Sequence, residues 1–329
     1  MSMNIARGCR ALLVATAMAA VAGGAFAQQE YPSRTVRILS AQTPGGPSDS
    51  LIRNVAELLS KGLGQPVVVE SRPGAGGMVA GEACARAAAD GYTLCFADSF
   101  ATMLNPHLYA NMRYDPLKDF TPIVLLGFIP SGIWVHKDVP ANSMTELFEL
   151  ARQKPRQINI ASWGRASSPY IYAEYLKRKG IEFTDVPYKA AGDAWRAVLA
   201  GEVQFTNYSI MTGMRQGEGR TRLLAVNTDR RIPEFPNVPT FAEIGLPAVQ
   251  TWFALFAPVG TPAEIVRRVH AEISKSVFQN PEIVARHFTA QGFVTNAPVA
   301  APPDELARYL SAQTKMYESY VEAANIRRQ

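Results

Sequence analysis

The chain has 329 residues, which as a prior corresponds to two lobes of roughly 150 residues each. Hydrophobic residues make up 47% of the chain and charged residues 19%. These proportions are typical of a globular protein with a large core, and they exclude a disordered chain or a collagen-like repeat. The formal net charge of +5 is small for this length, so the composition predicts no nucleic-acid or membrane-surface partner.

The first 27 residues have the three-part layout of a secretory signal peptide. Arg7 and Arg10 supply positive charge, an apolar run covers 11–24, and Ala25-Phe26-Ala27 fits an A-x-A cleavage site. A membrane anchor is the alternative, but a spanning helix needs about 20 apolar residues and this run is shorter. We therefore expect cleavage after Ala27 and export of the remaining chain.

Cys84 and Cys95 follow this segment, and two interpretations of them stay open. An exported protein meets an oxidising compartment, where the two cysteines can form a disulfide. Alternatively, both are small core residues, because free cysteine packs as a buried hydrophobe and both neighbourhoods are apolar.

Short runs rich in Val and Ile alternate with helix-length amphipathic segments, which is typical of sheets covered by helices. The expected strands are, in chain order, 35–41, 66–70, 93–97, 122–128, 132–136, 158–162, 183–188, 203–207, 223–227 and 252–258. Ser143 and Thr261 each precede a glutamate by three residues and predict helix capping boxes. Asn280 and Pro281 predict the start of another helix, and a long final helix is expected from Pro303 to about residue 325.

The chain lacks the sequence patterns of catalytic or metal sites. Its four histidines are far apart, and no H-E-x-x-H or C-x-x-C pattern occurs. The segment 46–50 lacks the closing glycine of a G-x-S-x-G nucleophile elbow. The glycine cluster at 73–77 has Val79 where a dinucleotide fingerprint needs glycine. We expect no catalytic residues, no metal site and no cofactor.

Four loops follow predicted strands and carry small residues, hydroxyls and helix starts: 43–49, 96–106, 162–169 and 188–194. Ligands of α/β sheets bind just outside the carboxyl ends of the strands. Helix N-termini favour anions there, because their first N–H groups are unpaired. Each loop alone is explained by capping and turn formation, but the four together predict a carboxylate pocket.

Several ordered motifs resemble the periplasmic receptors of tripartite tricarboxylate transporters, often called Bug proteins. The motifs cover nearly the whole expected mature chain: TPGGPSD, GQPVVVESRPGAGG, DGYTL, NPHLY, YDPLKDFTPI, VPYKAAGDA and WFALFAPVGTP. The resemblance implies an α/β, two-lobed Venus-flytrap binding protein. Each lobe is expected to be a mostly parallel sheet flanked by helices, with hinge strands at 122–136 and 250–258. Lobe 1 would comprise 28–130 and 252–329, and lobe 2 would comprise 131–251.

The family resemblance also implies a function. The protein would act in the periplasm as a monomer, bind a small organic acid or amino acid between its lobes, and deliver it to the membrane subunits of a tripartite tricarboxylate transporter. It implies no catalysis. The expected ligand-binding residues are Pro44, Gly45, Gly46, Asp49, Asp98, Ser99, Arg165, Ser167, Ser168, Tyr188, Lys189 and Asn207.

The sequence departs from the family pattern at several of these positions. Asp98 and Phe100 replace small residues, and Arg165 replaces a small or amide residue beside Trp163. Asn207-Tyr208 stands where the family shows Asp-Asn, which leaves open which residue takes the acidic position.

Asp98 and Arg165 have three interpretations. They form a salt bridge across the cleft, or Asp98 holds a ligand ammonium and Arg165 a carboxylate, or both lie in water on the rim. In the second case, Trp163, Phe100 and Tyr208 would form apolar walls.

Two other functional classes remain as alternatives. One is an exported hydrolase or isomerase that uses Asp98, Tyr188 and Lys189 as acid and base. The other is a partner that presents its ligand to a sensor kinase.

Overall fold

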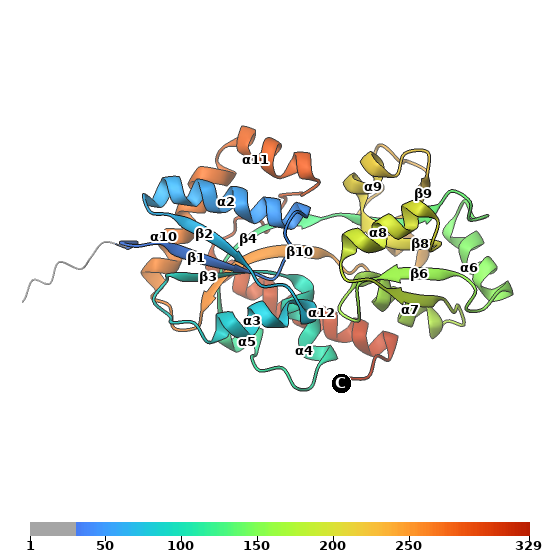
Figure 1. Cartoon of the computed structure of the whole chain (residues 1–329), viewed down its shortest axis with the longest axis horizontal. Coiled ribbons are helices and arrows are strands. Elements are labelled where there is room, and N and C mark those ends of the chain that lie inside the picture. Colours follow the sequence, from blue (N-terminus) through green and yellow to red (C-terminus); the bar gives the residue numbers. More distant parts are fainter. Residues whose placement is uncertain (1–30) are drawn as a thin grey trace, which may run out of the picture.

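The computed structural model describes residues 31–329, so the expected signal peptide at 1–27 lies outside the described residues. Figure 1 shows two lobes, each built on a five-stranded sheet with helices packed on its faces. The expected two-lobed α/β fold is thus confirmed.

The sheet of the first lobe has the strand order β2-β1-β3-β10-β4. β1 pairs in parallel with β2 and β3, whereas β10 pairs antiparallel with β3 and β4. Four strands therefore run in one direction and β10 runs against them. The bounds are β1 (Val36–Ser40), β2 (Val67–Ser71), β3 (Thr93–Asp98), β4 (Phe120–Ile129) and β10 (Thr251–Pro258).

The sheet of the second lobe repeats this plan in the order β7-β6-β8-β5-β9. β6 pairs in parallel with β7 and β8, and β5 pairs antiparallel with β8 and β9. β5 is therefore the reversed strand of this sheet. The bounds are β5 (Ser131–His136), β6 (Asn159–Ser162), β7 (Thr184–Pro187), β8 (Phe205–Ser209) and β9 (Thr221–Asn227).

The two sheets meet where β4 continues into β5 through the single residue Pro130. A second connection, residues 228–250, leads from β9 to the start of β10. The first residues of β10 pair with the ends of β3 and β4, and Ser131 at the start of β5 pairs with the ends of β8 and β9. The carboxyl ends of the forward strands in the two sheets therefore face each other across this junction (Figure 1).

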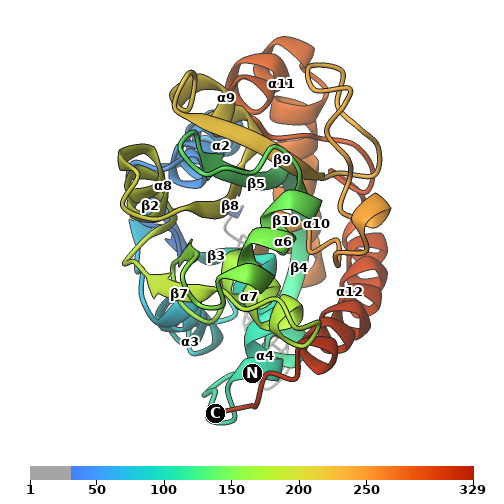
Figure 2. The same ribbon diagram turned by 90° about the vertical axis from the view of Figure 1, so that its right-hand side faces the viewer.

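Helices cover both faces of the sheets, as Figure 2 shows from the side of the second lobe. Those of the first lobe are α2 (Pro47–Leu63), α3 (Met78–Ala85), α4 (Asn105–Leu108), α5 (Pro116–Asp119), α10 (Ala263–Ile273) and α11 (Pro281–His287). Those of the second are α6 (Met144–Gln153), α7 (Ser168–Lys177), α8 (Ala191–Ala200) and α9 (Ile210–Gln216). The long α12 (Pro303–Ala324) contacts both β4 and α7 and so joins the lobes. Within residues 31–329, none of these helices combines the length and apolar character needed to cross a membrane.

The core follows from the alternation of side chains along the strands. Along β10, Phe253 and Leu255 face the cluster under α2 and α10, whereas Trp252 and Phe256 face the cluster that includes residues of α12. This latter cluster continues without a break into the second lobe, where it includes Tyr172 of α7. The α12 side of both lobes thus shares one hydrophobic core.

The expected elements are found, and the structure corrects their ends. The Ser143 hydroxyl accepts a hydrogen bond from the Glu146 amide at 3.1 Å, so this predicted cap is confirmed. The predicted cap at Thr261 is wrong, because α10 begins after Pro262 and the Thr261 hydroxyl donates to the Pro258 carbonyl at 2.7 Å. β8 extends to Ser209, so Asn207 lies inside the strand.

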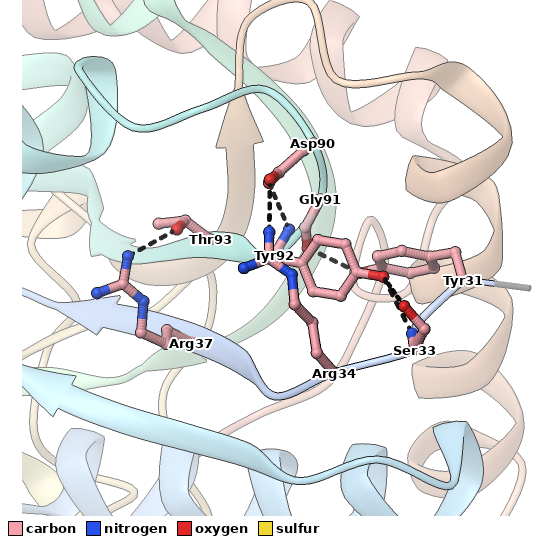
Figure 3. Close-up of polar contacts among 8 residues, drawn as sticks. All are labelled: Tyr31, Ser33, Arg34, Arg37, Asp90, Gly91, Tyr92 and Thr93. Carbon is pink, nitrogen blue, oxygen red and sulfur yellow. Dashed lines mark hydrogen bonds and ion pairs between the residues drawn. The ribbon is translucent and has the colours of Figure 1, made fainter. Parts of the chain in front are cut away.

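The first described residues are tied to the turn before β3, at the end of the sheet away from the second lobe (Figure 3). The Tyr31 hydroxyl donates to the Gly91 carbonyl at 2.7 Å. The Arg34 guanidinium lies 2.9 Å from the Asp90 carboxylate and 4.2 Å from the centroid of the Tyr92 ring. These contacts hold the start of β1 against the start of β3.

Cys84 of α3 and Cys95 of β3 form a disulfide, with their Cα atoms 6.0 Å apart. Both residues are buried in the core that α12 covers. Of the two interpretations of these cysteines, the structure therefore supports the bond, which fastens α3 to the sheet.

We expect the double variant Cys84→Ala/Cys95→Ala to lose ~2–3 kcal/mol of unfolding free energy, because the bond closes a short loop and restricts the unfolded chain. Urea unfolding with and without a reductant measures this. The reductant should lower the midpoint of the wild-type protein and leave that of the double variant unchanged. An equal response of the two proteins would contradict the assignment.

Candidate functional site

The loops expected to bind ligand gather at the junction between the sheets. The loop 41–46 follows β1, and Ser99 follows β3 in the first lobe. The loops 163–167 and 188–190 follow β6 and β7 in the second lobe. Because the carboxyl ends of both sheets face this junction, the topology directs loops from both lobes toward one region.

Two glycines of the first lobe lie close to the second lobe. A Cβ atom placed on Gly76, whose φ is +63°, would lie 3.2 Å from the Cβ of Ala166 in the second lobe. A Cβ atom on Gly292 would lie 2.6 Å from the Cβ of Met211. Both glycines thus permit interlobe contacts that a side chain would obstruct.

Three helices direct uncapped N-termini toward this junction. α2, α7 and α8 follow the strands there, and no side-chain hydrogen bond caps any of them. Among the described residues, no acceptor contacts the amides of Ser48, Asp49, Ser168, Tyr170, Ala191 and Gly192. Unpaired amides at helix N-termini attract anions, since the dipole end is also positive.

Asp49 shapes the loop that contains Pro44, Gly45 and Gly46. Its Oδ2 accepts from the Gly45 amide at 3.0 Å and from Arg53 Nε at 3.0 Å. Burial alone would raise the pKa of this carboxyl, but the hydrogen bonds from Arg53 and Gly45 outweigh it and lower the pKa. Asp49 is therefore a carboxylate whose charge is balanced within the first lobe, and the amide of Gly45 is already occupied.

Asp98 is connected to the same loop through Gln42. The Asp98 carboxylate accepts from the Gln42 side-chain amide at 2.9 Å and from the Ala101 backbone amide at 2.8 Å. The Gln42 carbonyl oxygen in turn accepts from the Ser48 hydroxyl at 2.9 Å. This chain links the end of β3 to the first turn of α2, so Asp98 positions the loop. Both Asp98 oxygens are engaged by donors of the first lobe.

Ser99 and Phe100 serve the packing of the first lobe in this structure. The Ser99 hydroxyl donates to the Gln250 carbonyl at 3.2 Å and accepts from the Trp252 amide at 3.4 Å. The Phe100 ring contacts Tyr317 of α12, with centroids 6.3 Å apart. Ser99 therefore ties β3 to the chain that enters β10.

In the second lobe, Ser168 and Asn207 meet below the start of α7. The Ser168 hydroxyl donates to Asn207 Oδ1 at 2.6 Å, and both residues are buried. Asn207 Nδ2 has no hydrogen-bond partner among the described residues. The Ser167 hydroxyl donates to the Gly164 carbonyl at 2.5 Å, so its side chain shapes the loop. Asn207 is thus the one of these three side chains with an unused donor.

Aromatic side chains border this part of the second lobe. Trp163, Tyr188 and Tyr208 are half-buried and pack against the cluster that contains Trp195. The Tyr208 ring stacks on Trp195, with centroids 5.0 Å apart. The neighbouring Lys189 is exposed, and no ion pair engages it among residues 31–329.

Arg165 forms its hydrogen bonds with α7 and the end of the chain, and none with Asp98 among the described residues. Its guanidinium donates to the Tyr170 hydroxyl at 3.2 Å and to the Arg327 carbonyl at 2.9 Å. No ion pair joins Arg165 to Asp98 among the described residues, so the first of the three interpretations, a salt bridge across the cleft, does not hold in this structure. Sequence reasoning also overlooked Gln42, although it directly precedes the loop 43–49 that was singled out.

The arrangement can hold an anion mainly with neutral donors. Amide groups from both lobes remain unpaired, while the two nearby carboxylates, Asp49 and Asp98, are bound to donors of their own lobe. Within residues 31–329, no cluster of three His, Cys, Asp or Glu side chains could hold a metal ion.

Known proteins resemble this chain in sequence and structure. A sequence profile described as "Tripartite tricarboxylate transporter family receptor" matches residues 51–326. Protein BugT of Bordetella pertussis is 30% identical over 324 residues, covering 97% of this chain and 98% of that protein. Rpa4515 of R. palustris, solved with adipate, is 30% identical with a TM-score of 0.82, covering 91% of this chain and 100% of that one. MatC from Rhodopseudomonas palustris, solved with bound malate, is 30% identical with a TM-score of 0.79, covering 88% and 100%.

Asp98 should make stability depend on pH in a direction opposite to that of a salt-bridged carboxylate. Burial raises its pKa, and the hydrogen bonds from Ala101 and Gln42 offset only part of that rise. The folded state then holds the proton more tightly than the unfolded state. The unfolding free energy should therefore fall as pH rises from the ordinary pKa of aspartate to the raised one.

Urea unfolding at a series of pH values checks this against Asp98→Asn, which cannot titrate and keeps an oxygen for the Ala101 amide. The stability of the wild-type protein relative to this variant should decrease with rising pH. A difference that stays constant or increases would contradict the expectation.

Proposed function

The chain belongs to the family of tripartite tricarboxylate transporter receptors, and we propose that it is a periplasmic solute-binding protein for a small carboxylate or amino acid. It would deliver this ligand to the membrane subunits of a tripartite tricarboxylate transporter. The observation that carries the proposal is the set of unpaired amides that α2, α7 and α8 direct toward the junction of the two lobes. A carboxylate between the lobes would accept hydrogen bonds from both and so favour closure.

A carboxylate ligand is favoured over an amino acid. An ammonium group needs an acceptor, and both oxygens of Asp98 already have donors. Among the described residues, Asp49 Oδ1 and Asp185 Oδ1 are buried carboxylate oxygens without a hydrogen-bond partner. The charge of Asp49 is already paired with Arg53. The related proteins solved with adipate and malate support a dicarboxylate.

We propose that the ligand contacts come from Gly46, Ser168, Tyr188, Lys189 and Asn207. Each of them has a donor that no described residue engages: the backbone amides of Gly46 and Ser168, the Tyr188 hydroxyl, the Lys189 ammonium and Asn207 Nδ2. The Ser168 hydroxyl is not available, because it donates to Asn207. The other expected residues would position the loops that carry these donors. Asp49 does so by accepting from the Gly45 amide, and Asp98 by accepting from the Gln42 side chain.

The expected lobe boundaries are part of the proposal. Strand membership of the two sheets supports a first lobe of 28–130 and 252–329 and a second lobe of 131–251, although α12 reaches across to α7. We also propose export with cleavage after Ala27 and action as a monomer.

The alternative of an exported hydrolase or isomerase requires Asp98 to act with Tyr188 and Lys189. No hydrogen bond or ion pair joins Asp98 to either of them among residues 31–329. Presentation of the ligand to a sensor kinase would use the same binding site, and a transport assay with the membrane subunits distinguishes it from delivery.

Ligand binding should raise the melting temperature, because a ligand that binds only the folded protein stabilises it by about 2.7 kcal/mol at a hundredfold excess over its dissociation constant. Thermal unfolding with malate, adipate, other dicarboxylates and amino acids tests this. A panel in which no compound shifts the melting temperature would refute the receptor function. Turnover of a bound ester or amide would instead support the enzyme.

Gly46→Val should weaken ligand binding at least about tenfold while leaving the fold intact. Gly46 has extended backbone angles that valine adopts readily, and an added Cβ would meet only the Thr43 carbonyl at 3.9 Å. The larger side chain would obstruct the approach of a carboxylate to the start of α2. Calorimetry of the series Gly46, Gly46→Ala and Gly46→Val should show affinity falling with side-chain size at constant unliganded melting temperature. Unchanged affinity would place the site elsewhere.

A further inference from the structure

A cavity lies between α7 of the second lobe and the C-terminal tail, which we define as residues 325–329, and of the loop 163–167 only Arg165 lines it. Its volume is about 430 Å³. Four cationic side chains line it, those of Arg165, Lys177, Arg178 and Arg327, with Glu174 as the single acidic side chain. We call this cavity the basic groove.

The three guanidinium groups of the basic groove have no ion-pair partner among the described residues. Among residues 31–329, no carboxylate lies within 4.0 Å of the guanidiniums of Arg165, Arg178 or Arg327. Lys177 reaches Glu174 only at 4.0 Å. Lys177 also begins the run Lys-Arg-Lys, the longest basic run of the chain. Gathered like charges repel one another, and an anion in the groove would relieve that repulsion.

The walls of the groove are held in place by hydrogen bonds. The Gln329 amide donates to the Leu108 carbonyl at 2.9 Å, and Arg328 Nε donates to the Tyr109 carbonyl at 3.2 Å. These bonds fasten the tail to the first lobe. On the other wall, the bonds of Arg165 to Tyr170 and Arg327 fix its guanidinium, and its Nε is buried without a partner.

The spacing of the cations fits an extended acidic chain better than a small anion. Arg165 precedes α7, whereas Lys177 and Arg178 lie at its other end. A ten-residue helix is ~15 Å long, which matches roughly five residues of extended peptide. One small carboxylate or phosphate could reach the cations at only one end.

We propose that the basic groove binds an acidic segment of a partner protein, the membrane subunit to which the receptor delivers its ligand. Carboxylates spaced along the segment would pair with Arg165 at one end of α7 and with Arg178 and Arg327 elsewhere in the groove. This inference rests on the proposed delivery function, because a receptor needs a recognition surface outside its ligand site. The basic groove supplies such a recognition surface, with one wall from α7 of the second lobe and the other from the tail that is fastened to the first lobe.

The test uses a fluorescein-labelled hexaglutamate peptide and the full chain, with fluorescence anisotropy at low ionic strength. Arg178→Gln/Arg327→Gln should weaken peptide binding about tenfold or more, because two uncompensated charges are removed. The matched control is Arg152→Gln/Lys154→Gln, which removes two exposed charges at the end of α6 in the second lobe. The control should change affinity less than about twofold. If the double variant is unstable in thermal unfolding, the single variant Arg178→Gln replaces it in the anisotropy measurement.

Three results would overturn the proposal. Equal weakening in both double variants would mean diffuse attraction to a basic protein. Unchanged peptide binding with lower melting temperature would mean that these cations only stabilise the end of α7. Loss of binding to phosphatidylglycerol vesicles, without loss of peptide binding, would identify an anionic membrane surface as the occupant.

The same proteins separate this inference from the proposed function. Thermal unfolding with malate should give the groove variant and the wild-type protein the same shift, because the groove lies outside the ligand site. No shift in either protein, with selective peptide binding retained, counts against the receptor function and leaves the groove supported.

Discussion

The passage from β4 to β5 through one residue governs the geometry of this molecule. Pro130 leaves the chain no length to turn back, so two sheets that share this connection must meet end to end. The Pro130 carbonyl also accepts from the Ile210 amide at 3.0 Å, which fixes the junction to the end of β8. The forward strands of both sheets end at the junction, and their loops can therefore act on one ligand without long excursions of the chain.

The charges around the ligand loops follow a consistent principle. A receptor for anions cannot leave carboxylates uncompensated in a poorly screened space, because like charges repel strongly there. Asp49 is paired with Arg53, and Asp98 is held by amides of its own lobe. These carboxylates orient the loop that carries Gly45 and Gly46, and neutral amides remain to meet the ligand. Specificity then depends on geometry more than on net charge.

Local signals in the sequence predicted much of this structure. Strand runs, the Ser143 cap and the family motifs identified the two lobes, because burial and capping are properties of neighbouring residues. The partners of individual side chains were harder to predict than the elements that carry them. Asp98 and Arg165 were expected in the cleft, yet Asp98 binds Gln42 and Arg165 binds the carbonyl of Arg327, 162 residues further along the chain. Such partners depend on tertiary packing. The small net charge likewise concealed the local run that begins at Lys177.

The hydrophobic core on the α12 side passes from one lobe to the other through Tyr172, Val249 and Tyr317. If the two lobes separated completely, this shared core would be exposed to water, at a free-energy cost that grows with the apolar area uncovered. The lobes are therefore expected to rock about the α12 side and open at the opposite edge. The shared core also makes the lobes one cooperative unit, in which loss of packing in either lobe exposes apolar surface of the other.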